Sequence, residues 1–190
     1  MKRNFITLVL LSSALFSLTP TLATTKEYTI DPKHSYIEYH ISHFGFSNPS
    51  GKWMPEGKIV IDEAKPQNSS VKVNINVANF ITGIPELNKH LNEELFFDTK
   101  KFPTATFVST KIDRIGKERA LIHGTLTVKG ISKPITLKVK LNKKGISPVN
   151  DKLTYGFTAN TTLRRSDFGL KALLPGLGNE IKLDIEVEAN

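Results

Sequence analysis

The chain has 190 residues, with 26 lysines and arginines against 18 aspartates and glutamates, so its formal net charge is +8. It contains no cysteine, which excludes thiol catalysis, cysteine metal sites, disulfides and the acylated cysteine of a bacterial lipoprotein. The basic balance favours anionic surfaces, but the lysines are scattered and no aromatic residue interrupts their densest run at 138–144, so nucleic-acid binding is not expected.

Residues 1–23 have the pattern of a secretory signal peptide. A short basic head precedes an apolar run from Phe5 to Leu18, and small residues lie at Thr21 and Ala23, where a signal peptidase would cleave. A membrane anchor is the alternative, but the run is shorter than the roughly 20 residues needed to span a bilayer. We therefore expect cleavage after Ala23 and a single periplasmic domain at 24–190.

Beyond this segment, apolar and polar residues alternate, which is typical of β-strands with one buried face. The clearest case is 71–77, where valine or isoleucine at every second position alternates with lysine and asparagine. Turn sequences rich in glycine, proline, asparagine and lysine separate the segments. Eight strands are predicted in chain order, at residues 35–44, 52–62, 70–80, 104–113, 119–129, 134–144, 152–164 and 180–188.

One segment, 85–97, has helical rather than strand periodicity. Pro85 suits the first turn of a helix, and Leu87, Leu91 and Leu95 recur at four-residue spacing on one face. Long strands in one unbroken series favour a barrel over a sandwich. The predicted fold is therefore all-β, an eight-stranded antiparallel lipocalin-like barrel with one short helix between strands 3 and 4.

A barrel of this size is either filled by its own side chains or holds one ligand, and periodicity leaves both alternatives open. The same question applies to Phe96, Phe97 and Phe102, which follow the helix beside one end of the barrel. Their rings would either plug that end or line the mouth of a tunnel. Strand parity predicts an interior formed by Ile37, Tyr39, Ile41, Val73, Ile75, Val77, Phe107, Leu126, Leu137, Val139, Phe157 and Leu183.

Four stretches of the chain resemble the YceI family of bacterial secreted proteins: YTIDPKHSYIEYHISHFGFS (28–47), HLNEELFFDTKKFPTATFVST (90–110), GTLTVKGISKPITLKVK (124–140) and RSDFGL (165–170). They follow one another in order along essentially the whole mature chain. The resemblance implies an extended lipocalin-like barrel that binds polyisoprenoid lipids, such as isoprenoid quinones, with the tail threaded through the interior. One departure is Leu87-Asn88, where the family often has Arg-Asp, so a polar contact supplied there in relatives is in doubt.

The candidate ligand-binding residues combine strand parity with the segments that carry the resemblance. For Arg165, a role at a lipid head group and a loop-fixing ion pair remain alternatives. The full candidate set is Ile37, Tyr39, Ile41, His43, Trp53, Val73, Ile75, Val77, Phe96, Phe97, Phe107, Leu126, Leu137, Val139, Phe157, Arg165, Phe168 and Leu183.

No catalytic residue and no metal site are predicted, because the histidines are not spaced to converge. His40 and His43 lie on opposite faces of one strand.

The first functional hypothesis is a periplasmic carrier or store of a long-chain isoprenoid lipid. It needs no cofactor, holds the lipid or quinone as its ligand, touches an anionic membrane surface transiently, and allows a homodimer. The second is a redox accessory or enzyme that uses a bound quinone-like cofactor, with His43 or His90 taking part. The third is a solidly packed structural or adhesion domain.

Overall fold

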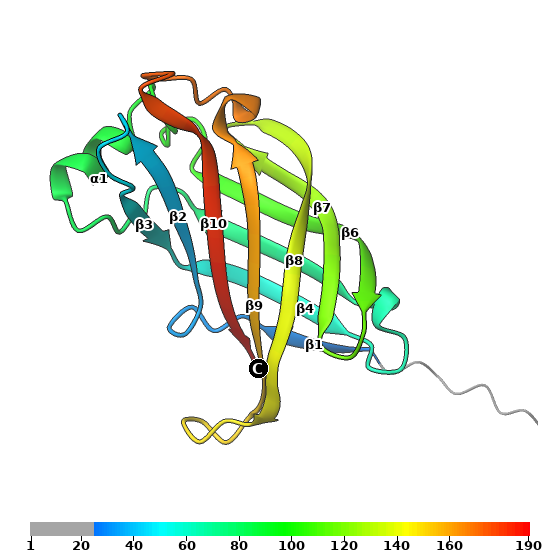
Figure 1. Ribbon diagram of the computed structural model, residues 1–190. Coiled ribbons are helices and arrows are strands. Elements are labelled where there is room, and N and C mark those ends of the chain that lie inside the picture. Colours follow the sequence, from blue (N-terminus) through cyan, green and yellow to red (C-terminus); the bar gives the residue numbers. More distant parts are fainter. Residues whose placement is uncertain (1–24) are drawn as a thin grey trace, which may run out of the picture.

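The computed structural model describes residues 25–190, so the predicted signal peptide lies outside the described part. One antiparallel sheet of ten strands accounts for nearly all regular structure (Figure 1). In the described part, no helix is long and apolar enough to cross a membrane. The strands are β1 (Lys26–Thr29), β2 (Tyr36–His43), β3 (Ser50–Trp53), β4 (Pro55–Ile61), β5 (Ser70–Asn76), β6 (Thr104–Ile115), β7 (Arg119–Val128), β8 (Ile131–Ile146), β9 (Leu153–Arg164) and β10 (Leu177–Ala189).

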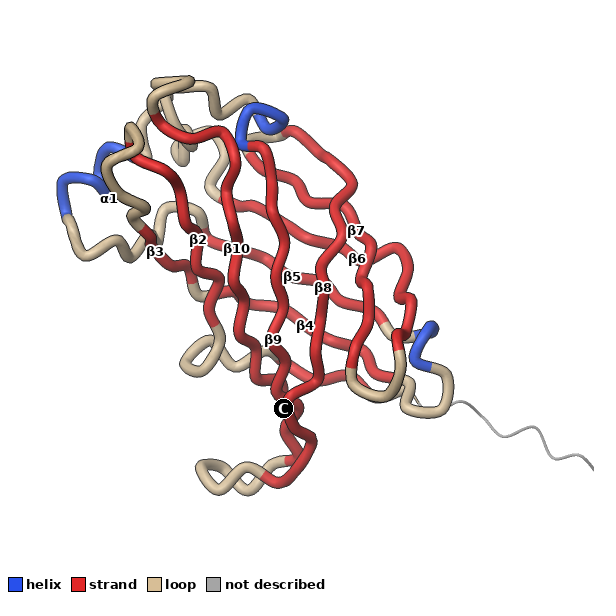
Figure 2. The backbone as a smooth tube through the Cα atoms, viewed as in Figure 1, coloured by secondary structure: helices blue, strands red, loops and turns tan. Residues whose placement is uncertain are grey.

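The sheet curls on itself into a barrel-like wall (Figure 2). Its strand order is β1-β4-β5-β6-β7-β8-β9-β10-β2-β3, yet β3 and β4 are separated in the chain only by Met54. One bent segment thus pairs with β2 through β3 and with β5 through β4. The end of β1 also meets the end of β10, where Ile30 bridges Ala189 and where Thr29 and Asn190 exchange backbone hydrogen bonds of 2.9 and 3.0 Å.

The predicted count of eight strands is therefore wrong by two. The expected strand 52–62 is divided, because its chain changes neighbours from β2 to β5 at Met54. The other addition, β1, pairs with β4 over four residues, which is too short for alternation to be recognised in the sequence. The remaining seven strands lie where the alternation predicted them, within a few residues at each border.

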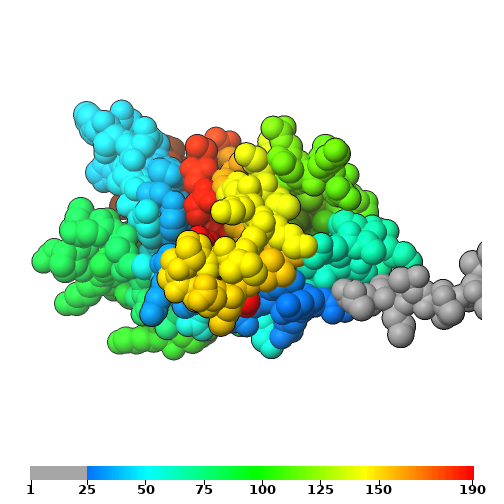
Figure 3. Space-filling view, turned by 90° about the horizontal axis from the view of Figure 1, so that it is seen from below, coloured from blue at the N-terminus to red at the C-terminus, as the bar shows by residue number. Residues whose placement is uncertain are grey.

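The connections gather at two opposite ends of the curled sheet (Figure 1). The helix end carries residues 43–49, 77–103 and 165–176, which include α1 (Pro85–Leu91) and the 3₁₀ turn η2 (Arg165–Phe168). The turn end carries the β4–β5 connection, which contains the 3₁₀ turn η1 (Pro66–Asn68), and the shorter β6–β7 and β8–β9 connections. Figure 3 shows the turn end in space-filling form, with the β8–β9 connection in front.

The helix α1 ends at Leu91, so the predicted helix 85–97 is too long. The next residue, Asn92, caps the helix: its side-chain amide donates to the Asn88 carbonyl, and its side-chain oxygen accepts from the Thr99 hydroxyl. The chain then turns, which brings Phe96 and Phe97 inward and leaves Leu95 exposed rather than on the apolar helix face. The packing of the Phe96 and Phe97 rings in the interior therefore ends the helix before Leu95, although the four-residue spacing of the leucines predicted that it continues.

The predicted strand register is confirmed. On β5, Lys72 and Asn74 are exposed while the alternating Val73 and Ile75 face inward and line the lumen. On β8, Lys138 and Lys140 are likewise exposed and Val139 faces inward. A slip of one residue would reverse every one of these positions, so the apolar face is specified strongly.

Candidate functional site

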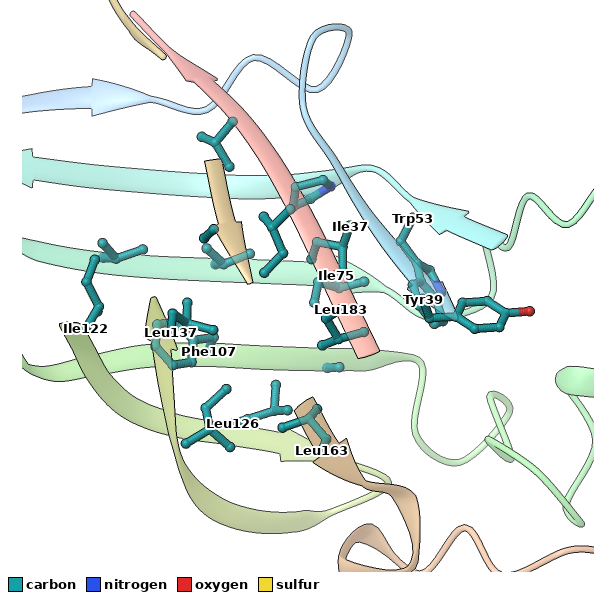
Figure 4. Close-up of a pocket in the computed structure, with 18 of the residues that line it drawn as sticks. Ile37, Tyr39, Trp53, Ile75, Phe107, Ile122, Leu126, Leu137, Leu163 and Leu183 are labelled. Atoms are coloured by element: carbon teal, nitrogen blue, oxygen red, sulfur yellow. The ribbon is translucent and has the colours of Figure 1, made fainter. Parts of the chain in front are cut away.

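The lumen of the sheet is hollow and apolar. It encloses a cavity of about 870 Å³, toward the upper end of the roughly 300–1,000 Å³ that is typical of small-molecule sites. Inward residues such as Ile75, Leu137 and Leu183 line this cavity and are only half-buried (Figure 4). The interior is therefore not filled by its own side chains, and of the two alternatives left open by periodicity the structure has the hollow one.

Every residue of the candidate ligand-binding set lies in the wall of this cavity. Whether these residues contact a ligand stays a prediction. The wall also contains residues outside the set, among them Ile59, Val71, Ile112, Ile122 and Ile181. Four of them have the same parity as the chosen residues of their strands, so alternation could have selected them too. Ile112 has the opposite parity to Phe107, and it faces the lumen only because a β-bulge lies between Ser109 and Lys111.

At the helix end, the wall is a cluster of aromatic rings. The centroid of Trp53 lies 5.3 Å from that of Tyr39 and 4.8 Å from that of Phe80, and Phe80 lies 5.0 Å from Phe97. Figure 4 shows Tyr39 and Trp53 side by side at the edge of the lumen. Burial raises the pKa of the Tyr39 hydroxyl above its ordinary value. Phe80 was not among the candidates, because in the predicted strand 70–80 it has the parity of the outward residue Lys72. In the structure β5 ends at Asn76, and Phe80 lies in the connection that follows.

The three phenylalanines that follow the helix, Phe96, Phe97 and Phe102, have different places in the structure. Phe96 is buried beside His90, with ring centroids 4.7 Å apart, and Phe97 packs on the aromatic cluster; both line the cavity. Phe102 lies outside the cavity and rests against Gly130 of the β7–β8 turn, where a Cβ atom would come within 2.8 Å of its ring. Two of the rings thus belong to the wall, and the third braces it from behind.

The guanidinium of Arg165 fixes the β9–β10 connection. It is only 6% exposed and donates to the backbone carbonyls of Gly178, Leu170, Ala172 and Leu177 at 2.7–2.8 Å. Among residues 25–190, no carboxylate lies within ion-pair distance of it, and burial lowers its pKa. Arg165 holds a loop, as one alternative proposed, but through carbonyl oxygens rather than through an ion pair.

At the turn end, charged and phenolic groups join three parts of the wall. The Tyr155 hydroxyl donates to Glu63 at 2.6 Å, and the Lys144 ammonium donates to the other oxygen of the same carboxylate. The bond from Lys144, and then the one from Tyr155, hold the pKa of Glu63 below its usual range, while burial is the main cause that raises the pKa of Tyr155. Beneath this network, Tyr28 packs edge-on against Tyr155 at 4.8 Å.

The histidines do not form a common site. His43 and His90 both line the helix end of the cavity, but His43 packs against Phe44 and His90 pairs with Glu93 at 3.0 Å. His123 instead bonds Thr136 on the outer face. In the part of the chain that the structure describes, no three His, Asp or Glu side chains are grouped to hold a metal ion.

Known proteins of similar sequence and fold match this chain over most of its length. A family model described as the YceI-like domain matches residues 28–189. A UPF0312 protein of Pseudomonas putida (strain GB-1) is 36% identical over 192 residues, covering 99% of this chain and 97% of that protein. The solved YCEI protein of Campylobacter jejuni is 32% identical, with a TM-score of 0.68 over 76% of this chain and 86% of that chain. A polyisoprenoid binding domain from Saccharophagus degradans has a TM-score of 0.64 at 14% identity, covering 86% of this chain and 97% of that domain, which is a likeness of fold.

Proposed function

Because this chain belongs to the YceI-like family, as its sequence motifs predicted, we propose that it binds a long-chain isoprenoid lipid within the lumen. The observation that carries this proposal is the hollow apolar cavity of about 870 Å³ inside a sheet that otherwise has a well-specified inner face. The likeness of fold to a polyisoprenoid binding domain from Saccharophagus degradans supports the same class of guest.

The energetics of such a guest favour retention. Each isoprene unit adds five carbons, worth roughly 4 kcal/mol gross at about 0.8 kcal/mol per buried methylene. Ordering the flexible chain and fixing its position take back part of this gain. A guest of several units would still stay bound through purification, and an isoprenoid quinone is one lipid with such a tail.

Binding rather than catalysis is the role that the wall supports. His43 and His90, which the redox alternative requires, lie in the wall with partners of their own, Phe44 and Glu93, and do not face one another in a hydrogen-bonded pair. A purified protein with a quinone spectrum that changes on reduction by a physiological donor would favour the redox accessory. A colourless protein with a stoichiometric lipid would favour the carrier.

The protein acts in the periplasm after cleavage behind Ala23. This part of the proposal depends on the sequence pattern of residues 1–23, which lie outside the described residues. N-terminal sequencing of the protein from a periplasmic extract should begin at Thr24. Full-length chain in the membrane pellet would contradict the proposal.

The first test of the ligand is mass spectrometry of a solvent extract from the purified mature protein. We expect one long-chain apolar lipid in near-stoichiometric amount. If the delipidated protein melts at the same temperature with and without added isoprenoid quinone or polyprenol, the lumen does not bind these lipids and the proposal fails.

The second test uses two neighbouring residues of β5, Ile75 inside and Asn74 outside. In Ile75→Lys the new ammonium is hydrated in the empty lumen, but an apolar guest would have to desolvate it. We expect lipid affinity to fall by at least roughly tenfold in Ile75→Lys and to be unchanged in the control Asn74→Lys. Trp53, the single tryptophan of the chain, lies in the wall and reports binding by its fluorescence. Equal affinity of the two variants would place the guest elsewhere.

A further inference from the structure

Two loops at the helix end expose large apolar side chains beside the cavity. We name these the rim loops, residues 43–47 and 169–177. Phe46, at the tip of the first loop, is 91% exposed, and Leu173, in the second, is 54% exposed. Leu173 and Ser47 also line the cavity, so the exposed apolar surface is continuous with the proposed lipid site.

The exposure of Phe46 is built into an ordered turn. The amide of His43 donates to the Ser47 carbonyl at 2.8 Å, and the amide of Phe46 donates to the His43 carbonyl at 2.9 Å. The turn is therefore closed by its own backbone, and it presents the Phe46 ring outward rather than folding it onto the sheet.

The two rim loops are also fastened to each other and to the fold. The Phe44 amide donates to the Gly176 carbonyl at 2.8 Å. The Phe44 ring covers Gly176 so closely that a Cβ atom there would meet it. Arg165 holds the second loop through the carbonyls of Leu170 and Ala172. Both loops contain a non-glycine residue with left-handed φ, 53° at Phe44 and 58° at Leu173, which persists only where the surroundings over-determine the backbone.

The charge of the rim loops is unlike that of the turn end. The sequences HFGFS and GLKALLPGL contain one formally charged residue, Lys171, and no carboxylate. The cavity rim at the turn end instead carries Glu63 and Glu118 among its cations. The rim loops therefore offer apolar side chains and a cation without any anion that an acidic surface would repel.

We infer that the rim loops are the surface through which the protein docks on a lipid bilayer, with Phe46 entering the interface and Lys171 facing anionic headgroups. This inference rests on the proposed function, because a lumen that takes up a membrane lipid must meet the membrane at an open end. A second copy of the chain fits this place less well, since a partner seated on the rim loops would cover the part of the cavity wall formed by Ser47 and Leu173. Exposed apolar side chains flanked by a cation are the usual elements of interfacial binding.

The test is flotation of the mature protein with vesicles of phosphatidylcholine, with and without phosphatidylglycerol. The variant Phe46→Ser/Lys171→Glu changes one apolar and one basic residue of the rim loops, neither of which lines the cavity. The matched control Val149→Ser/Lys143→Glu likewise replaces one exposed apolar and one exposed basic residue, but at the turn end. We expect the first variant to lose at least roughly tenfold in vesicle affinity, and the control to bind like the wild type.

Docking and lumen binding are separated by the Trp53 fluorescence assay with detergent-dispersed lipid. The rim variant should keep its affinity for dispersed lipid but lose uptake from vesicles. Ile75→Lys should do the reverse, docking on vesicles but failing to bind lipid. If the wild type does not bind dispersed lipid, the proposed function fails. If the wild type binds dispersed lipid but does not bind vesicles, only the docking inference fails.

Two further outcomes would overturn the inference. Equal vesicle binding by the wild type and the rim variant, or a larger loss in the turn-end control, would place docking elsewhere. A wild-type dimer in gel filtration that the rim variant dissociates would assign the rim loops to a second copy. Since Phe46 is 91% exposed, Phe46→Ser alone, with unchanged melting temperature, serves if the double variant fails to fold.

Discussion

The two ends of the lumen are built from different chemistry, although the same strands lead to both. The helix end has an aromatic wall, exposed apolar loops and one buried arginine that binds carbonyl oxygens. The turn end has short connections joined by a carboxylate, an ammonium and a phenol. The helix end is thus held by hydrogen bonds from a buried guanidinium and leaves apolar surface outside, whereas the turn end is joined by polar groups that contact water.

The largest effect should come from the helix end, through Arg165→Met. Four backbone carbonyls would lose a charged donor in a buried site, so we expect the free energy of unfolding to fall by about 3 kcal/mol or more. Urea unfolding of the purified protein measures this loss. The neighbouring Arg164 is exposed, and Arg164→Met should change stability by less than about 0.5 kcal/mol. Equal effects of the two would show that the loop does not depend on Arg165.

The next prediction compares Phe97, which lines the cavity, with Phe102, which lies behind the cavity wall. Phe97→Ala removes a half-buried ring from contact with Trp53 and Phe80, and should cost about 2 kcal/mol of stability. Phe102→Ala removes a half-buried ring that does not reach the lumen, and should cost a similar amount. Only Phe97→Ala should also lower the content of copurified lipid. If Phe102→Ala lowers it as much, the two rings do not differ in role.

A smaller effect is expected at the turn end, from Tyr155→Phe. The ring keeps its packing on Tyr28, and only the bond from the hydroxyl to Glu63 is lost, which should cost about 1 kcal/mol. The control is Tyr36→Phe, because no hydrogen bond of its hydroxyl is found among the described residues. Thermal melting of both variants tests this, and a loss above that of Arg165→Met would reverse the order of the two ends.

The smallest effect is the pH dependence of the hydrogen-bonded network of Glu63, Lys144 and Tyr155 at the turn end. Lys144 and Tyr155 hold the pKa of Glu63 below its usual range, so its contribution is present above the pKa of an unfolded glutamate. That contribution is lost as the pH falls through the lower pKa of the folded state. The wild-type melting temperature should therefore decline below about pH 5, and the decline should be shallower in Glu63→Gln. Glu94→Gln, at an exposed carboxylate, should follow the wild-type curve.

Strand positions and inward faces could be predicted from the sequence, because alternation is a local property of each segment. The polar residues next to them in the chain are enough to predict an inward side chain at Val73, Ile75, Val139 and Leu183. A register slip would expose all four. The family could be recognised too, since its motifs are runs of adjacent residues. The candidate ligand-binding residues were chosen from the same two signals, strand alternation and the family motifs.

What only the tertiary structure decided depends on residues far apart in the chain. The division of 52–62 at Met54 follows from which strands lie on either side, and Phe96, Phe97 and Phe102 take different roles only because the aromatic cluster and the Gly130 turn surround them. The carbonyls that bind Arg165 are gathered by a loop whose path no local pattern specifies. Above all, a hollow lumen depends on how far the sheet curls and how deeply opposite side chains reach, and alternation along single strands carries neither quantity.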